Sequence, residues 1–330
     1  MKKKVLIFLF MFIFILTGCG SESESSVLKA FEKKINNSNS YHLTGVLEMV
    51  RNENSYLYDV DVAFEKEDKF RVSLTNQSND HNQIILKNSD GVYVLTPSLN
   101  KSFKFQSEWP YNNSQSYLLQ TILKDIKNDE ERTFEKNDDG YVFTVKADYP
   151  NNKDLVKQHI YIDKDYNVTE VKIVDSSDIT QMRMRIDNID YKSTYEDNYF
   201  NLNSNIKSEE VDTTTSKTLD DIIYPMYVPA NTSLTGQDIV ETENGERVIL
   251  TFDGDKPFMV VQENIIVSDE VETIPVYGDP LLITDTIGAM TDTSINWVSN
   301  NVEYYLVSDS LDTDELISVA TSMSLLPVGK

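Results

Sequence analysis

The single cysteine of this chain, Cys19, has the clearest chemistry, because it ends the segment Leu16-Thr17-Gly18-Cys19. Lys2–Lys4 precede an apolar run from Val5 to Leu16. A basic start, roughly 7–15 apolar residues and small residues before a cut are typical of a secretory signal, whereas about 20 apolar residues span a bilayer. We therefore predict that 1–18 are a lipoprotein signal peptide and that the Cys19 thiol carries a thioether-linked lipid. The alternatives are an uncleaved signal anchor, or ordinary secretory cleavage with an incidental cysteine.

Acidic side chains dominate the rest of the chain. The formal net charge is −24, and removal of residues 1–18 with their three lysines makes it −27. Nucleic-acid backbones and anionic headgroups are bound by clustered Lys and Arg, so this charge argues against both as partners. Membrane attachment then depends on the lipid, and stable anchoring takes more than one acyl chain. We expect a protein on the extracytoplasmic face of the cell membrane, lipid-anchored at Cys19, with no nucleic-acid partner.

The residues that usually carry catalysis do not form a recognisable motif. His42, His81 and His159 lie in separate strand-like stretches without the H-x-x-x-H spacing of a zinc site. The chain also lacks a G-x-S-x-G nucleophile elbow, a G-x-G-x-x-G loop and a Walker-type loop. We therefore expect no enzymatic activity, no cofactor and no metal site.

Acidic clusters leave one weak alternative, which is loose calcium binding. Asp163–Asn167 begins like a calcium loop, but Val168 and Val174 occupy the positions where Gly and Glu are required. This segment is therefore interpreted as a turn between strands. Two further clusters, Asp253 with Asp255 and residues 269–272, fit either solvated loops or weak calcium sites.

The periodicity of apolar residues predicts the elements that must position any site. Residues 19–26 are small and polar, which favours a flexible tether, and the apolar residues of 27–35 have helical spacing. The pattern then changes to the period of two that is typical of strands, with a second helical stretch at 114–128. We predict strands around 56–64, 70–74, 84–86, 92–95, 103–105, 141–147, 160–162, 171–173 and 182–186.

These elements predict one antiparallel meander of roughly eleven strands over 27–203, followed by a linker at 204–221. A small acidic α+β domain over 222–330 follows, with strands near 248–252, 258–261 and 304–307. Its last element is predicted to be a helix that Asp312 caps, because Glu315 follows at the spacing of a capping box.

The order of these elements resembles the LolA-like lipoprotein carriers, and more closely the Gram-positive sporulation and germination lipoproteins of the YdcC and GerS type. The C-terminal unit is similar to a small domain of unknown function that is attached to such lipoproteins and to some anti-sigma factors. The matching residues are Phe70-Arg71-Val72, Asp90-Gly91-Val92-Tyr93-Val94, Trp109-Pro110, Gln115-Ser116-Tyr117-Leu118-Leu119, Tyr149-Pro150-Asn151-Asn152, Gln158-His159-Ile160-Tyr161-Ile162-Asp163, Tyr227-Val228-Pro229 and Ile295-Asn296-Trp297.

This resemblance implies a mainly β (α+β) fold, in which an antiparallel half-barrel wraps around helices and leaves an apolar cavity. It implies binding of acyl chains or of a hydrophobic partner segment, without catalysis. A set of aromatic and methionine residues occupies alternate positions of the predicted strands, so that their side chains share one face of each strand. These are the candidate cavity-lining residues. They are Tyr56, Tyr58, Phe64, Phe70, Tyr141, Phe143, Met182 and Met184. The alternative is that the same side chains simply pack an ordinary core.

Two functions remain open. The first is a membrane-anchored protein that binds an apolar ligand, either lipid acyl chains or an acylated lipoprotein, in a half-barrel cavity. The second is a protein-interaction or sensor module in envelope signalling, sporulation or germination, of the RseB or GerS kind, with an envelope protein as partner. A scaffold whose acidic domain contacts cationic wall components is a third, less specific, interpretation.

Overall fold

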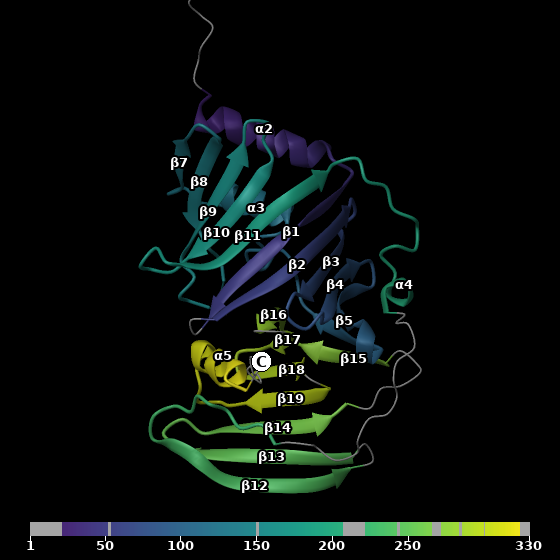
Figure 1. Cartoon of the computed structure of the whole chain (residues 1–330), viewed down its shortest axis with the longest axis vertical. Helices are drawn as coiled ribbons and strands as arrows, with labels where there is room; N and C mark the ends of the chain where they lie inside the picture. The colour runs from purple at the N-terminus through teal and green to yellow at the C-terminus, as the bar shows by residue number, and fades with distance from the viewer. Residues whose placement is uncertain are drawn as a thin grey trace, which may run out of the picture.

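The computed structural model describes residues 22–51, 54–149, 152–206, 222–242, 245–265, 272–283, 286–299 and 301–323. The predicted signal peptide, Cys19 and residues 207–221 of the predicted linker lie outside the described residues. Two open β-sheets dominate the described part of the chain, so the predicted mainly β (α+β) class is confirmed (Figure 1).

The larger sheet contains twelve strands in the described residues, in the order β15-β6-β5-β4-β3-β2-β1-β11-β10-β9-β8-β7. Neighbours are antiparallel except for the parallel pair β15 and β6. The sheet stays open, with β15 and β7 at its edges. The N-terminal strands are β1 (Ser40–Arg51), β2 (Asn54–Glu65), β3 (Lys69–Asn76), β4 (Asn82–Asn88), β5 (Gly91–Thr96), β6 (Lys101–Gln106), β7 (Thr133–Lys136), β8 (Gly140–Lys146), β9 (Lys157–Asp163), β10 (Val168–Val174) and β11 (Thr180–Asp190).

Strand β1 was not among the predicted strands, although its inward residues alternate regularly. Tyr41, Leu43, Leu47 and Met49 are all buried, and Gly45 lies among them at a shift in the register with β11. An alanine-like Cβ at Gly45 would lie 2.1 Å from the carbonyl oxygen of Arg185, so the close approach of the two strands requires glycine there.

Two helices pack on the larger sheet and complete its core. Helix α2 (Glu24–Asn37) contributes Val27, Phe31 and Ile35, and α3 (Leu119–Asn128) contributes Leu119, Ile122 and Ile126. Both arms of the sheet contact the same core, since Phe103 of β6 and Phe143 of β8 belong to it. The sheet therefore wraps around α3, while α2 lies across one end (Figure 1).

Both helices begin at residues other than those predicted. Helix α2 begins at Glu24, inside the predicted tether, because the Ser23 side chain caps it by accepting a hydrogen bond from the backbone N–H of Ser26. Helix α3 begins at Leu119, so 114–118 form a loop instead of its first turn.

A short segment after β11 covers the outer face of the larger sheet. Helix α4 (Leu202–Ile206) ends this covering segment. Within the larger sheet, the 3₁₀ turn η2 (Pro97–Leu99) joins β5 to β6. Phe200 and Ile206 of the covering segment pack with Ala63, Leu86 and Tyr93 of the sheet in a separate buried cluster.

The smaller sheet contains seven strands in the described residues, in the order β12-β13-β14-β19-β18-β17-β16. Helix α5 (Thr313–Thr321) covers one face of this sheet through Leu316 and Ala320. The predicted capping box is confirmed, because Asp312 and Glu315 each accept a hydrogen bond from the backbone of the other. The strands are β12 (Thr232–Thr242), β13 (Gly245–Gly254), β14 (Phe258–Asn264), β16 (Asp279–Ile283), β17 (Thr286–Met290), β18 (Ser294–Ser299) and β19 (Val302–Val307).

The two sheets are connected more closely than the predicted division into 27–203 and 222–330 implies. Strand β15 (Glu272–Tyr277) follows β14 in sequence but pairs with β6 of the larger sheet. Gly278, with φ +96°, then turns the chain into β16; a Cβ there would lie 2.0 Å from the Met290 carbonyl oxygen. One strand, β15, therefore lies in the sequence range of the predicted small domain but belongs to the larger sheet.

A buried amide also joins the sheets. Gln83 of β4 is 3% exposed, and its Oε1 accepts hydrogen bonds from the Ile287 N–H at 2.5 Å and the Thr286 hydroxyl at 3.2 Å. Its Nε2 donates to the Thr96 hydroxyl at 3.2 Å. Ile287 and Val298 of the smaller sheet are buried in the core of the larger one. The smaller sheet is therefore fixed against the open end of the larger sheet.

Candidate binding groove between the sheets

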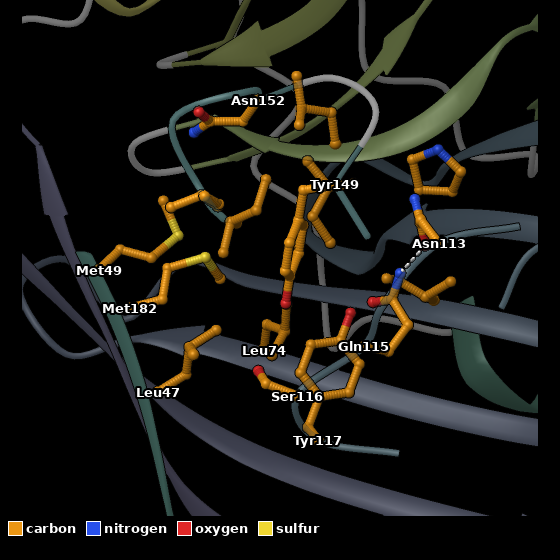
Figure 2. A pocket seen from close by; sticks show the side chains of 16 residues that line it. Leu47, Met49, Leu74, Asn113, Gln115, Ser116, Tyr117, Tyr149, Asn152 and Met182 are labelled. Carbon is orange, nitrogen blue, oxygen red and sulfur yellow. Dashed lines mark hydrogen bonds between the residues drawn. The ribbon is translucent and has the colours of Figure 1, made fainter. Parts of the chain in front are cut away.

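An apolar cavity among the described residues lies where the two sheets meet, and we call it the inner cavity. Its volume is about 90 Å³. Figure 2 shows side chains from both sheets and two loops around it. The lining residues are Leu47, Met49, Leu74, Ile85, Asn113, Gln115, Ser116, Tyr117, Tyr149, Asn152, Leu155, Met182, Pro280, Leu281, Leu282 and Ile287.

The strands of the larger sheet supply one wall of the inner cavity. Met49 of β1 lies directly opposite Met182 of β11, and both face the cavity. Leu74 of β3 continues this wall. Methionine side chains are flexible and polarisable, so this wall can adapt to apolar groups of different shape. The opposite wall comes from Leu281 and Leu282 of β16, which follow the turn at Gly278.

Hydrogen bonds hold the loop before α3 in place, and this loop supplies the polar part of the lining. The Ser114 N–H donates to the Asp148 carbonyl at 2.7 Å, and the Asp148 N–H donates to Ser114 Oγ at 2.9 Å. Ser114 Oγ and Gln158 Nε2 each donate to Asp125 Oδ2 at 2.6 Å. Burial raises the pKa of Asp125, and these two hydrogen bonds oppose that shift. The loop is thus a rigid support for its neighbour Ser116.

Two hydroxyl groups in the lining are buried without a hydrogen bond of normal geometry. They are the hydroxyls of Ser116, which is 1% exposed, and of Tyr149. Burial raises the pKa of Tyr149, and the neighbouring Ser116 hydroxyl opposes this shift. Both phenol and serine therefore stay neutral at physiological pH and offer O–H donors. Buried polar groups are normally paired, so these two hydroxyls can receive a polar group from a ligand.

A wider polar space, the outer trough, continues from the inner cavity. It has a volume of about 580 Å³ and shares Met49, Asn152, Leu155 and Met182 with the inner cavity. Helix α5 forms its far side. Its lining residues are Met49, Val50, Asn152, Asp154, Leu155, Asp175, Ser176, Gln181, Met182, Tyr227, Asp314, Ile317, Ser318 and Thr321. We call the inner cavity and the outer trough together the junction groove.

Among the described lining residues of the outer trough, the charged groups are all acidic, and they are Asp154, Asp175 and Asp314. The Ile179 N–H donates to Asp175 at 3.0 Å, and this bond lowers the pKa of that carboxyl, which therefore stays ionised. In the part of the chain that the structure describes, the carboxylates of Asp154 and Asp314 form no hydrogen bond or ion pair. The described lining of the trough therefore carries negative charge and contributes no cation to balance it.

The candidate residues predicted from sequence lie mostly in the core instead of in this groove. Of the eight, Met182 lines the groove. Five are buried in the core of the larger sheet, namely Tyr58, Phe64, Phe70, Phe143 and Met184. The remaining two, Tyr56 and Tyr141, are partly buried and pack against that core.

Aromatic stacking explains why the predicted side chains leave little space between them. The Phe64 ring lies 5.1 Å from the Tyr41 ring and 5.0 Å from the Phe70 ring, and Phe70 meets Trp109 edge to face at 6.0 Å. Such offset and edge-to-face pairs are favourable packing. These aromatic rings fill the interior of the half-barrel, and the open space lies at its end.

Several groove residues were not predicted. Leu47 and Met49 follow the same alternation as the predicted strands, so a strand at 40–51 could have revealed them. The loop residues Asn113–Tyr117 and the residues of β16 carry no local signal, because long-range packing brings them to the cavity.

No group of three metal-ligating side chains is found among the described residues. His42 pairs with Asp61 at 2.7 Å, and His159 with the Thr144 hydroxyl at 2.8 Å, so each has an ordinary structural partner. Within the described ranges, none of the helices has the length and apolar character needed to cross a bilayer.

The chain is 32% identical over 304 residues to sporulation protein YdcC of Bacillus subtilis (strain 168), and the match covers 91% of this chain and 90% of that protein. No family model matches the chain. A chain of the Pseudomonas aeruginosa MucA/MucB complex is similar at 11% identity and TM-score 0.34, covering 93% of this chain and 99% of that one. A chain of the complex between the CwlD amidase of Clostridioides difficile and the GerS lipoprotein is similar at 15% identity and TM-score 0.23, covering 55% of this chain and 100% of that one.

Proposed function

The chain belongs to the family of sporulation protein YdcC, and on that premise we propose that it is a lipid-anchored, extracytoplasmic binding protein of the sporulating cell. In this proposal the junction groove holds an apolar group of a lipid or of an acylated protein. The observation that supports it is the apolar inner cavity, with Leu47, Leu74 and Leu281 around it.

The size of the inner cavity limits what it can hold. Pockets that enclose a drug-sized ligand have roughly 300–1,000 Å³, whereas the inner cavity has about 90 Å³. It therefore fits one large side chain or the end of one hydrocarbon chain. Each buried methylene contributes about 0.8 kcal/mol, so an end of four carbons contributes roughly 3 kcal/mol. This is a moderate contribution, which calls for further contacts in the outer trough.

We propose binding without catalysis, because the hydroxyls in the groove lack the partners of an activated nucleophile. A serine nucleophile needs an adjacent base within hydrogen-bond reach. The neighbour of Ser116 is Tyr149, whose raised pKa keeps it a neutral phenol. The acidic residues of the trough, Asp154, Asp175 and Asp314, are not among the described lining residues of the inner cavity.

Membrane attachment through Cys19 remains a proposal, since this residue lies outside the described ranges. A thioether-linked lipid with an acylated amino group resists neutral hydroxylamine. Labelled palmitate is therefore expected to remain on the protein after hydroxylamine treatment and to be absent from a Cys19→Ser variant. Absence of label from the unchanged chain would contradict the anchor.

The binding function can be tested by blocking the groove. Met182 lines both the inner cavity and the outer trough, so Met182→Trp places a large ring where they meet. The full chain carrying Cys19→Ser avoids competition from its own lipid, and a fluorescent palmitate analogue serves as the probe. Loss of two buried methylenes corresponds to about tenfold weaker binding.

Met259→Trp is the matched control, because Met259 lies on β14, is 37% exposed and does not line the groove. The control is expected to bind the probe as the unsubstituted chain does. Equal affinity in all three chains, or no binding in any, would rule out the groove as an apolar site.

A second candidate function is a protein-interaction module of the cell envelope. The wide, polar outer trough favours it, because a lipid tail gains little from such a surface. Crosslinking in intact sporulating cells is expected to give one partner protein in a stoichiometric complex. Recovery of lipid alone would exclude this candidate.

A further inference from the structure

We infer that the junction groove recognises a basic segment of a partner protein, of which one side chain with an apolar body and a polar tip enters the inner cavity. The inference rests on the proposed role of the junction groove as a binding site and assigns it a different ligand, a peptide segment in place of an acyl chain. Tyrosine between lysines is the simplest peptide of this kind.

The charge of the outer trough selects for a cationic ligand. Asp154, Asp175 and Asp314 line it, and no lysine or arginine is among its described lining residues. Asp154 lies on the loop before β9, whereas Asp314 lies in the first turn of α5, so the two negative charges stand on opposite sides of the junction. A segment that lies along the trough can therefore place one cation on each side.

The same charges disfavour the headgroups of membrane lipids. Anionic headgroups bind clusters of basic residues, and the trough presents the opposite charge. The predicted mature chain as a whole has a formal net charge of −27, which includes these three residues. An anionic headgroup in the trough would lie next to carboxylates of the same charge, and this repulsion weakens its binding. The charge of this surface therefore favours a basic polypeptide over an anionic lipid.

The hydroxyls of the inner cavity supply a second, independent observation. Ser116 is 1% exposed, and its hydroxyl has no hydrogen-bond partner of normal geometry, as is also true of the Tyr149 hydroxyl. The two hydroxyls are neighbours, and a hydrocarbon tail would offer neither of them a further partner in a buried site, which is costly. A phenol or a carbonyl oxygen can accept their hydrogen bonds, while its apolar body contacts Leu74 and Leu281.

The amides at the border between cavity and trough fit an extended peptide. Asn152 lines both spaces, and its Oδ1 already accepts the Asp154 N–H at 3.2 Å, so its side-chain NH₂ remains as a donor toward the groove. A backbone carbonyl is the usual acceptor for such a group, whereas an acyl chain has none beyond its ester.

The test compares capped synthetic peptides on the full chain carrying Cys19→Ser. The first probe has one tyrosine with two lysines on each side, the second replaces the lysines by glutamates, and the third replaces the tyrosine by phenylalanine. We expect the lysine peptide to bind at least tenfold more tightly than the glutamate peptide at low salt, with a smaller ratio at high salt. We also expect the phenylalanine peptide to bind more weakly than the tyrosine peptide.

Variants locate the effect in the groove. Asp154→Asn with Asp314→Asn is expected to weaken the lysine peptide about fivefold, as for two partly exposed ion pairs. Asp138→Asn with Asp238→Asn is the matched control and is expected to leave binding unchanged, because these exposed residues lie on the β7–β8 turn and on β12. Ser116→Ala is expected to reduce the preference for tyrosine over phenylalanine.

The outcomes separate this inference from the function on which it rests. If the palmitate analogue binds and the lysine peptide does not, or if the lysine and glutamate peptides bind equally, the inference is overturned and the apolar binding function stands. If neither probe binds, both are overturned. If the lysine peptide binds but both double variants weaken it equally, the site lies elsewhere and the inference is likewise overturned.

Discussion

Removal of the Gln83 side-chain amide should weaken the connection between the two sheets. Gln83→Leu keeps the size of the side chain but leaves the buried Ile287 N–H without its acceptor at 2.5 Å. The Thr286 hydroxyl also loses a bond of 3.2 Å. An unpaired buried donor costs about 1–3 kcal/mol, and a lost neutral hydrogen bond about 0.5–1.5 kcal/mol. We therefore expect the free energy of unfolding to fall by about 2–4 kcal/mol.

The two tryptophans allow the effect to be followed in each sheet separately. Trp109 is buried in the core of the larger sheet and Trp297 in that of the smaller one. The Trp297→Phe chain keeps Trp109, so its fluorescence during urea unfolding reports the core of the larger sheet. The Trp109→Phe chain keeps Trp297 and reports the core of the smaller sheet. In the Gln83→Leu background the Trp297 signal is expected to shift to lower urea, because β17 loses its attachment.

Gln77→Leu is the matched control, since Gln77 is exposed in the turn that follows β3 and its side-chain NH₂ donates to Asp59 at 2.7 Å. An exposed substitution usually changes stability by less than about 0.5 kcal/mol. If Gln83→Leu destabilises the chain no more than Gln77→Leu, the buried amide is not what holds the sheets together.

Three further predictions concern single residues. Burial raises the pKa of Asp125 above its usual 3.8, so the folded state binds its proton more tightly than the unfolded state; stability should therefore fall as pH rises from below 3.8 through the raised pKa. Asp125→Asn should remove that slope in urea titrations at several pH values, and an unchanged slope would refute the assignment. Asp312→Ala removes the capping box of α5 and should cost about 1 kcal/mol in urea unfolding, with Asp309→Ala expected to be neutral. Gly278→Ala should expose the β17 amides to faster hydrogen exchange, because its Cβ would lie 2.0 Å from the Met290 carbonyl oxygen; unchanged exchange would show that the turn adapts.

The sequence predicted local elements well where their signal is local. The alternation from Tyr56 to Phe64 marks β2, and the Asp312 to Glu315 spacing marks the start of α5. The chain's affiliation to the YdcC family also agrees with the resemblance inferred from short motifs. These features depend on a few neighbouring residues, which is why they can be recognised in isolation.

The position of the groove could not be predicted in the same way. Alternation indicates which side chains of a strand face inward, but it does not distinguish a filled interior from an open one. Phe64 and Phe70 face inward and pack against each other with tilted rings, whereas Met182, with a similar pattern, reaches open space. The difference arises from β16 of the smaller sheet, which follows β15 of the larger sheet in the chain, and whose Leu281 and Leu282 line the cavity together with Met182.

Strand β15 also determines when the larger sheet can be completed during synthesis of the chain. Half of the chain lies between the end of its partner β6 and Glu272, so the edge of β6 is uncovered until late in synthesis. An uncovered strand edge is a template for pairing with other chains. We expect a product truncated before residue 272 to self-associate through β6. In the complete chain the new edge carries Pro275, which has no N–H to offer a further strand, so growth of the sheet stops there.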